Sequence, residues 1–498
     1  MELQDLTTIL NSSGQRGKLT AQVRGLARDS RAVRPGDLFV CLRGRVTDGH
    51  LFARDALARG AVGVVVEEFL SLPPEVPQVQ VPDTREALAG LSAHFYGAPS
   101  SHLRVVGITG TNGKTIVTYL IEAILDRNGH RCGRIGTVDY KIGPSVRRAE
   151  RTTPEALELQ RMLREMVDAG CRYAVLEVSS HGLALNRVAG CEFDVAVFTN
   201  LGHDHLDFHH TLAAYLDAKI KLFAGLHPTR TAKGPKYAIL NADDQHWRTI
   251  ANATPCPIIT FGQTADARVR AEDVELDGLT TRFQLVIDHA AVPVELQLPG
   301  PGNVNNALAA AAVGWVEGIP LERIARALES VRQVLGRFEV IHADLDRTII
   351  IDFAHNPDAL REILSVARRI AAGRPVIAVF GCEGRKDQTK RPLMGRIAAE
   401  GADYCVITSD NVYDESATTI AEEVERGVLA AGMPHSAYTI IPNRGEAIEA
   451  ALARAGSGAV IVVAGKGHET EWVVGDRHIA FNDREFAERM LAKTGQRR

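Results

Sequence analysis

The chain has 498 residues, of which 45% are hydrophobic and 24% are charged, and its formal net charge is −4. This length allows about two to four domains, and the near balance of charge gives no reason to expect a nucleic-acid or membrane-surface partner. No apolar run approaches the length of a membrane span.

The cysteines and the N-terminus point to the same compartment. Seven cysteines are scattered without a CxxC pair, which indicates reduced thiols and not a disulfide framework or a zinc site. The N-terminal "MELQDLTTILNSSGQ" has no basic segment followed by an apolar one, so we predict no secretory signal. We therefore expect a cytoplasmic, multi-domain α/β protein.

The pattern of the chain predicts three domains. Residues 1–100 contain "DSRAVRPGDLFV" and end after a proline-broken stretch, "LPPEVPQVQVP". Residues 101–332 carry the densest set of polar strand ends. A new alternation of strands and helices begins near "SVRQVLGRFEVI" and fills residues 333–498.

Short continuous apolar runs alternate with helical patterns along most of the chain, as expected for parallel strands covered by helices on both faces. Most runs end in polar residues, and ligands of open α/β sheets bind at the carboxyl ends of strands. The runs are "RVVGITG" (104–110), "YAVLEVSSH" (173–181), "DVAVFTNLG" (194–202), "YAILNADD" (237–244), "TIIIDFAH" (348–355), "PVIAVFGCE" (375–383), "YCVITSD" (404–410) and "AVIVVAGKG" (459–467).

The first of these strands leads into a predicted phosphate loop, "GITGTNGKT" (107–115). Glycines let successive N–H groups approach an anion at a helix N-terminus. Lys114 would reach the β- and γ-phosphates, and the Thr115 hydroxyl would bind Mg²⁺. The strict pattern has glycine where this chain has Ile108, so the match is a variant. The alternative is an ordinary glycine-rich turn, and kinases, GTPases and ligases all share such a loop.

Other strand ends offer candidate metal and nucleotide contacts. Glu177 in "EVSSHGLALNR" and His205 in "FTNLGHDHLDFHH" are candidate ligands for a second Mg²⁺ near the transferred phosphate. The histidine spacing fits no common structural zinc site. Lys219 reads as a solvated lysine on a helix. Asn303 and Asn306, in "LPGPGNVNNALAAAA", share one helix face. Their amides could bind the edge of a nucleotide base, but alone this pattern is a weak signal.

Taken together, these motifs resemble the Mur ligase family. "GITGTNGKT", "EVSSHGL", "FTNLGHDHLDFH", "GPGNVNNALAA", "GRFE", "DFAHNPDAL", "KRPLMG", "TSDN" and "AGKGHE" follow one another in the family's order. The N-terminal "DSRAVRPGDLFV" and "DGHLFARDALARGA" make the chain similar to the MurE type within it. The resemblance covers nearly the whole chain.

The resemblance implies an α/β protein with an N-terminal UDP-binding domain, a central P-loop ATPase domain with a mostly parallel sheet, and a C-terminal Rossmann-like domain that binds an amino acid. It implies an ATP- and Mg²⁺-dependent ligase of cytoplasmic peptidoglycan precursor synthesis, acting as a monomer. UDP-N-acetylmuramoyl-L-Ala-D-Glu would form an acyl phosphate at its D-Glu γ-carboxylate. The amine of meso-diaminopimelate, L-lysine or L-ornithine would then attack that acyl phosphate.

The resemblance also implies roles for single residues. Lys114, Glu177, His205 and Lys219 would be catalytic, and Lys219, once carbamylated, would join Thr115, Glu177 and His205 around Mg²⁺. The ATP contacts would be Gly110, Thr111, Asn112, Gly113, Lys114, Thr115, Asn303, Arg337, Asp352 and His355. The nucleotide-sugar-dipeptide contacts would be Ser30, Val46, Thr47, Thr152, Thr153, Ser179 and Arg187. The amino-acid contacts would be Lys386, Asp410, Asn411, Gly465 and Glu469.

The amino-acid pocket is where the sequence departs from the family. Relatives that add diaminopimelate read Asp-Asn-Pro-Arg, and their arginine pairs with the distal carboxylate, whereas here Val412 and Tyr413 follow Asp410-Asn411. Tyrosine cannot replace a bidentate arginine. Lys386 stands where the family has a second arginine, and the neighbouring Arg385 is a candidate substitute.

Two interpretations of this pocket follow. Asp410, Asp414, Glu415 and Glu469 would make it electronegative, which favours lysine or ornithine. Alternatively, Arg385 reads the carboxylate of diaminopimelate. Beyond this type, another Mur-type or folylpolyglutamate-type amide ligase, a generic P-loop kinase, and a non-catalytic nucleotide-sugar-binding homologue remain alternatives. The N-terminal block with "KRPLMG", "TSDN" and "GKGHE" disfavours the sister ligases, the C-terminal block disfavours a kinase, and the intact catalytic set disfavours a non-catalytic homologue.

Overall fold

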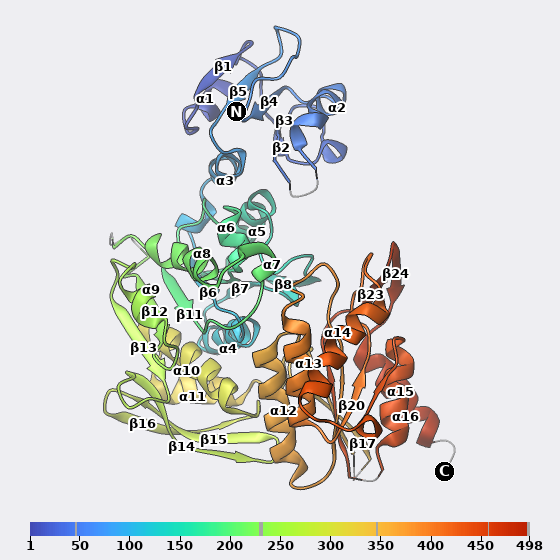
Figure 1. Ribbon diagram of the computed structural model, residues 1–498. Helices are drawn as coiled ribbons and strands as arrows, with labels where there is room; N and C mark the ends of the chain where they lie inside the picture. The colour runs from blue at the N-terminus through green and yellow to red at the C-terminus, as the bar shows by residue number, and fades with distance from the viewer. Residues whose placement is uncertain (45–46, 229–232, 345–346, 457, 496–498) are drawn as a thin grey trace.

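The computed structural model of the chain describes residues 1–44, 47–228, 233–344, 347–456 and 458–495 (Figure 1). Val46, one of the predicted nucleotide-sugar contacts, lies outside the described residues. Across the described segments, no helix combines the length and the apolar character that crossing a membrane requires.

The N-terminal domain is a small sheet with helices beside it. Its strand order is β1-β5-β4-β3-β2, and only the β1–β5 pair is antiparallel. The strands are β1 (Gly14–Arg16), β2 (Gly25–Ala27), β3 (Asp37–Val40), β4 (Gly63–Val66) and β5 (Gln78–Gln80). The helices are α1 (Leu3–Thr7), α2 (Ala53–Ala58) and α3 (Thr84–Phe95), with 3-10 turns at Ser30–Ala32, Gly49–Phe52 and Pro99–Ser101.

The central domain is built on an 11-stranded sheet in the order β16-β15-β14-β13-β12-β11-β6-β10-β7-β8-β9. Its strands are β6 (Arg104–Thr109), β7 (Cys132–Ile135), β8 (Asp139–Ile142), β9 (Ser145–Arg148), β10 (Tyr173–Glu177), β11 (Val195–Phe198), β12 (Tyr237–Asn241), β13 (Ile258–Gly262), β14 (Val269–Asp277), β15 (Thr280–Ile287) and β16 (Ala290–Leu296). Its helices are α4 (Lys114–Arg127), α5 (Ala156–Asp168), α6 (Ser180–Ala184), α7 (Leu206–His209), α8 (Leu212–Ala224), α9 (Trp247–Ala251), α10 (Pro301–Val316) and α11 (Leu321–Glu329).

The middle strands of this sheet are apolar on both faces because helices cover both. Along β6, Val106 and Ile108 belong to the core beneath α4, α10 and α11. Val105 belongs to the opposite core, beneath α5 and α8. Successive side chains of a strand point to opposite faces, so a continuous apolar run places the polar residues that follow it at the carboxyl edge of the sheet.

The C-terminal domain contains a six-stranded sheet in the order β17-β18-β22-β19-β20-β21, parallel except for β17. The strands are β17 (Glu339–Asp344), β18 (Arg347–Asp352), β19 (Val376–Phe380), β20 (Tyr404–Ile407), β21 (Tyr438–Ile440) and β22 (Val460–Ala464), and a separate hairpin is formed by β23 (Glu471–Val474) and β24 (Arg477–Ala480). The helices are α12 (Pro357–Ala371), α13 (Lys390–Gly401), α14 (Ala417–Ala430), α15 (Arg444–Arg454) and α16 (Asp483–Gly495), with a 3-10 turn at His435–Ala437.

In Figure 1 the N-terminal domain stands above the central domain, and the C-terminal domain lies beside the central one. The expected α/β class with mostly parallel sheets is confirmed. The boundaries near residues 100 and 332 stay predictions. The antiparallel extensions β7–β9 and β14–β16 were not predicted. Strand β15 alternates buried and exposed residues, as strands with one solvated face do.

Candidate active site

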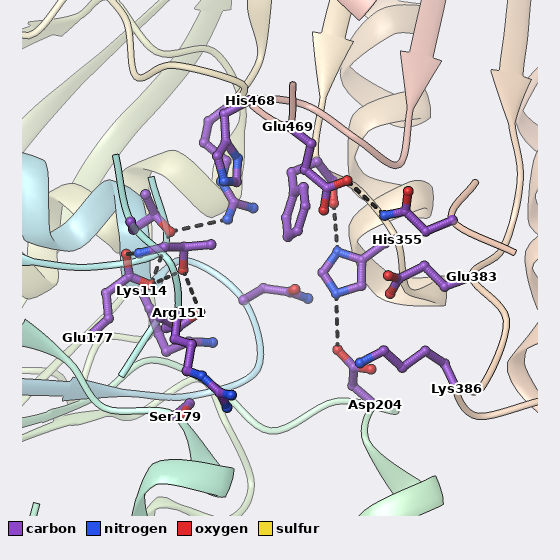
Figure 2. Close-up of a pocket in the computed structure, with 18 of the residues that line it drawn as sticks. Lys114, Arg151, Glu177, Ser179, Asp204, His355, Glu383, Lys386, His468 and Glu469 are labelled. Carbon is purple, nitrogen blue, oxygen red and sulfur yellow. Dashed lines mark hydrogen bonds and ion pairs between the residues drawn. The ribbon is translucent and has the colours of Figure 1, made fainter. Parts of the chain in front are cut away.

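A cavity of about 590 Å³ lies between the central and C-terminal domains (Figure 2). We call it the main cavity. Its walls come from the loop before α4, the segment after β9, the strand ends after β10 and β11, and the loops after β18, β19, β20 and β22. The carboxyl ends of two different sheets therefore face each other, which is where open α/β sheets bind ligands.

The predicted phosphate loop forms one wall of this cavity. Gly110 and Gly113 have φ of +154° and +86°, and a Cβ on Gly110 would lie 1.8 Å from Thr199 Oγ1. Lys114 Nζ donates to the carbonyl oxygens of Gly110 at 2.9 Å and Thr111 at 2.8 Å. Burial lowers the pKa of Lys114. The loop thus presents the N-terminus of α4 to the cavity, which is a site for an anion.

Glu177, at the end of β10, joins the phosphate loop to the neighbouring strand. It is 1% exposed. Its Oε2 accepts from Thr115 Oγ1 at 3.1 Å and from Thr137 Oγ1 at 2.9 Å, and its Oε1 accepts from the Thr137 N–H at 2.9 Å. Arg337, from the C-terminal domain, donates to the same Thr115 hydroxyl at 3.1 Å. The carboxylate is therefore fixed beside the hydroxyl predicted to bind Mg²⁺.

His205 lines the main cavity, whereas Lys219 is fully buried in the central domain. Burial lowers the pKa of His205 to about 3, so the imidazole is neutral and can donate a lone pair to a metal. Lys219 is 0% exposed, and its Nζ has no hydrogen-bond partner among the described residues. It lies 4.1 Å from the centre of the Tyr215 ring. Burial lowers the pKa of Lys219 well below its usual value, contrary to the expectation of a solvated lysine.

This donor set suits Mg²⁺ only when further oxygens are supplied. The described residues contain no group of three or more His, Cys, Asp or Glu side chains placed to hold a metal. Thr115, Glu177 and His205 nevertheless line the main cavity together. Hard cations such as Mg²⁺ take few protein ligands and complete their shell with water and substrate phosphates, so the sparse set fits a metal that arrives with a nucleotide.

Seven of the ten residues expected to contact ATP line the main cavity, and none lines a second space beside α10. Arg337 and His355 line the main cavity, and His355 Nε2 lies 3.5 Å from Asp204 Oδ2 (Figure 2). Asp352 does not line it and accepts the Phe338 N–H at 2.7 Å. Asn303 lines neither space and donates to the Pro299 carbonyl at 2.8 Å.

The second space is a cavity of about 260 Å³ beside α10, which includes Asn306 and Glu362 in its lining. Asn306 Nδ2 donates to Asn303 Oδ1 at 3.1 Å, and its own Oδ1 would lie 2.2 Å from a Cβ on Gly113. This cavity therefore adjoins the back of the phosphate loop, with amide groups in its wall.

The predicted dipeptide contacts do not share one space. Thr152 and Ser179 line the main cavity. Thr153 Oγ1 donates to the Glu177 carbonyl at 2.8 Å and to Ser179 Oγ at 3.1 Å. Arg187 instead pairs with Glu155 at 2.9 Å. Ser30 and Thr47 line a separate cavity of about 460 Å³ in the N-terminal domain.

Three of the five predicted amino-acid contacts line the main cavity, namely Lys386, Asn411 and Glu469. Asp410 and Gly465 do not, and Asp410 is 2% exposed. The buried Lys466 explains this arrangement, because its Nζ lies 2.6 Å from Glu469 Oε2, 2.9 Å from Asn411 Oδ1 and 3.7 Å from Asp410 Oδ1.

The electronegative pocket expected from the sequence is not formed as predicted. Asp414 pairs with Arg385 at 2.5 Å, and Glu415 pairs with Arg391 at 2.8 Å. Neither carboxylate lines the main cavity, and Arg385 does not line it either. Val412 is buried in the C-terminal core, whereas Tyr413 faces the cavity. Lining carboxylates on this side are Glu469, Glu471 and the unpredicted Glu383.

Several further lining residues were missed from the sequence. They include Thr137, Arg148, Arg151, Glu383 and His468. The arginine-rich stretch "VRRAER" directly before "TTPE" was a visible signal for the second and third of these. For Glu383 the signal was its place at the end of the apolar run "PVIAVFGCE", three residues before the predicted contact Lys386.

Comparison with known proteins identifies the family. Residues 22–96 match the model described as "Mur ligase family, catalytic domain", residues 108–314 match "Mur ligase middle domain", and residues 336–467 match "Mur ligase, glutamate ligase domain". The chain belongs to the Mur ligase family. The resemblance drawn from the motifs is confirmed, and with it the expectation of a ligase.

Curated relatives of this Mur ligase match along nearly its whole length. A protein of Geobacillus thermodenitrificans named UDP-N-acetylmuramoyl-L-alanyl-D-glutamate–2,6-diaminopimelate ligase is 44% identical over 98% of both chains. A Listeria monocytogenes protein with the same name is 42% identical over 93% of both. A solved structure with this name is 30% identical, covers 99% of both chains and has a TM-score of 0.68.

Proposed function

We propose that this Mur ligase uses ATP to join a diamino acid to the D-Glu γ-carboxylate of UDP-N-acetylmuramoyl-L-Ala-D-Glu. The observation that carries the proposal is the main cavity, in which Lys114 and Glu177 of the central domain share one space with Lys386 and Glu469 of the C-terminal domain. The names of relatives that are 40–44% identical support the same reaction. We place it in cytoplasmic peptidoglycan precursor synthesis, carried out by a monomer.

The first step of the proposed reaction transfers the γ-phosphoryl group of ATP to the γ-carboxylate. Such transfer depends on positioning and on neutralisation of charge. The N-terminus of α4 and Lys114 would hold the β- and γ-phosphates, and Arg337 would approach them from the C-terminal domain. Thr115, Glu177, His205 and a carbamylated Lys219 would hold Mg²⁺, which when bound draws charge from the phosphate oxygens.

Lys219 suits carbamylation because carbamate formation requires a neutral amine. Burial lowers the pKa of Lys219 and so favours that form, and its Nζ has no hydrogen-bond partner among the described residues. Reaction of the amine with carbon dioxide forms an N–C bond and releases one proton, so a basic group becomes an anion. An anion here would complete a cation site that otherwise holds a single carboxylate.

In the second step the amine of the diamino acid attacks the acyl phosphate and expels phosphate. Asn411 and Glu469 would orient the amino acid, because the buried Lys466 fixes both side chains. With substrates bound, the domains on the two sides of the cavity would exclude bulk water from it, which would protect an acyl phosphate from hydrolysis.

For the amino acid itself we propose diaminopimelate, which the relatives' names support. Lysine or ornithine is a second candidate. It is favoured because Tyr413 and Glu383, and not the family's arginine, line this part of the cavity. The orientation of Arg385 away from the cavity removes the simplest substitute for that arginine.

An assay of the full-length chain with ATP, Mg²⁺ and UDP-N-acetylmuramoyl-L-Ala-D-Glu tests the proposal. Diaminopimelate, lysine and ornithine are supplied separately, and the nucleotide tripeptide is identified by its mass. We expect the diaminopimelate adduct together with phosphate release. Absence of any tripeptide would overturn the ligase assignment, and preference for lysine or ornithine would replace diaminopimelate by the second candidate.

A further inference from the structure

The charges in the main cavity can be matched to those of the amino acid. Diaminopimelate carries two ammonium groups and two carboxylates, so its pocket needs two cations. Five lysine and arginine side chains line the cavity, and three of them contact the phosphate loop or Glu155. Lys114 is held by the phosphate loop, Arg337 donates to Thr115, and Arg151 lies 3.7 Å from Glu155.

The other two are Lys386 and Arg148, and neither forms a salt bridge with a carboxylate among the residues that the structure describes, although Arg148 interacts electrostatically with Glu471. They come from different domains. Lys386 follows β19 in the C-terminal domain and lies near Asp204 and Glu383 in Figure 2. Arg148 is the last residue of β9 in the central domain.

Arg148 reaches the amino-acid side of the cavity. Its Nη1 contacts Thr470 Oγ1, across the boundary between the two domains. Thr470 directly follows Glu469, and Glu471, Val473 and His478 of the β23–β24 hairpin line the same part of the cavity. A guanidinium in this position lies beside the predicted amino-acid contacts.

The candidate named from the sequence, Arg385, does not reach the cavity. Its side chain is 62% exposed and pairs with Asp414 at 2.5 Å. Its guanidinium carbon lies 5.3 Å from the centre of the Tyr413 ring. Tyr413 faces the cavity and Arg385 does not, so the tyrosine stands between this arginine and the substrate.

We propose that Arg148 is a specificity-determining residue that binds the distal carboxylate of diaminopimelate, while Lys386 binds the carboxylate next to the reacting amine. This inference rests on the proposed function. The guanidinium fork can form two parallel hydrogen bonds with a carboxylate, which makes it selective for substrates that carry one. Because Arg148 belongs to the central domain, this recognition requires that the two domains are close together.

The test uses Arg148→Gln, Arg148→Lys and two controls in the full-length enzyme. Arg147→Gln is the first control. Arg147 lies on the same strand as Arg148, pairs with Glu165 at 3.3 Å and does not line the main cavity. Arg385→Gln removes the alternative cation. For each variant, kcat and KM are measured for diaminopimelate and for the nucleotide dipeptide. Lysine, which lacks the distal carboxylate, is assayed beside diaminopimelate.

For Arg148→Gln we expect the KM for diaminopimelate to rise about 10- to 100-fold, the scale of a lost charged hydrogen bond. The KM for the dipeptide should stay unchanged, and the rate with lysine should not fall. Arg148→Lys should give a smaller rise, because charge is kept and the fork is lost. Both controls should behave as the wild type does.

Three results would overturn the inference. They are an unchanged KM for diaminopimelate in Arg148→Gln, a rise in the KM for the dipeptide instead, or the expected rise appearing in Arg385→Gln. Failure of the proposed function is distinguishable, because the wild-type enzyme would then form no diaminopimelate adduct at all. A wild type that forms the adduct, with an Arg148→Gln variant of equal KM, contradicts the inference alone.

Discussion

At the scale of single residues, the least expected environment is that of Lys219. A lysine on a helix is usually solvated, yet this side chain is fully buried, and its amine has no hydrogen-bond partner among the described residues. An unpaired buried amine is costly unless it is neutral or modified. The proposed carbamate would explain why a buried amine is tolerated at this position.

We predict that Lys219→Ala lowers kcat at least about 10- to 100-fold, as loss of a group supporting a metal site does. Lys221→Ala, two residues along the same helix and exposed, should keep full activity. With ¹³C-labelled bicarbonate, the wild type should show a carbamate carbon signal by NMR that is missing in Lys219→Ala. Full activity of the alanine variant would remove the carbamate from the mechanism.

Gly110 tests the phosphate loop. A methyl group there would lie 1.8 Å from Thr199 Oγ1, at a φ of +154°. We expect Gly110→Ala to displace the loop and to lower kcat/KM for ATP about 100-fold, since a shift of about 1 Å has effects of this size. Gly129→Ala is the matched control, because Gly129 has a φ of +80° and open space around its Cα. The control should lose some stability and keep its KM for ATP.

At the scale of elements, the loop after β20 shows what the sequence could not predict. The Val412 N–H donates to the Val473 carbonyl at 3.0 Å, and the Gly475 N–H donates to the Tyr413 carbonyl at 2.7 Å. The β23–β24 hairpin thus sets the direction of both side chains. Because these partners are about 60 residues away in sequence, local patterns do not reveal which side chain faces the cavity.

Helices α15 and α16 are joined by a buried ion pair. Arg444 and Asp483 are both 0% exposed and lie 2.6 Å apart. Asp483→Asn would leave a buried guanidinium without its counter-charge, so we expect a loss of about 3–5 kcal/mol in the free energy of unfolding. Chemical denaturation of the full chain measures it. Glu400→Gln, in a surface pair with Arg396, should cause no measurable change.

At the scale of the whole molecule, the site exists only where two domains meet. Asn356 Nδ2 donates to Asn112 Oδ1 at 2.9 Å, and His203 Nε2 lies 2.8 Å from Asp387 Oδ2. These contacts join the phosphate-loop side to the amino-acid side. These contacts hold the central and C-terminal sheets together, with their strand ends facing the main cavity.

We predict that His203→Ala weakens this apposition without unfolding either domain. Since His203 does not line the main cavity, the effect should be indirect, about a 3- to 10-fold rise in the KM for the diamino acid, as expected for one lost polar contact. Steady-state kinetics with thermal unfolding as a check separate the two effects. An unchanged KM, like that expected for the exposed His227→Ala control, would show that this contact has no part in assembling the site.

The sequence predicted the class of fold and the place of the phosphate loop between β6 and α4, because those features depend on local patterns. A strand, a glycine-rich loop and a lysine at a helix start are contiguous, so Lys114 and Thr115 could be placed early. Arg148 and Thr470 are 322 residues apart, and their contact depends on how two domains approach. Asn303 is the opposite case, because its side chain bonds to the Pro299 carbonyl within its own helix turn.

In the proposed reaction the D-Glu γ-carboxylate is phosphorylated before the amine attacks. This order can be measured with dipeptide substrate labelled with ¹⁸O in that carboxylate, together with ATP, Mg²⁺ and diaminopimelate. Attack on an acyl phosphate leaves one carboxylate oxygen on the phosphate, so we predict that ¹⁸O appears in the released inorganic phosphate. Unlabelled phosphate, formed at the same rate as the tripeptide, would contradict it.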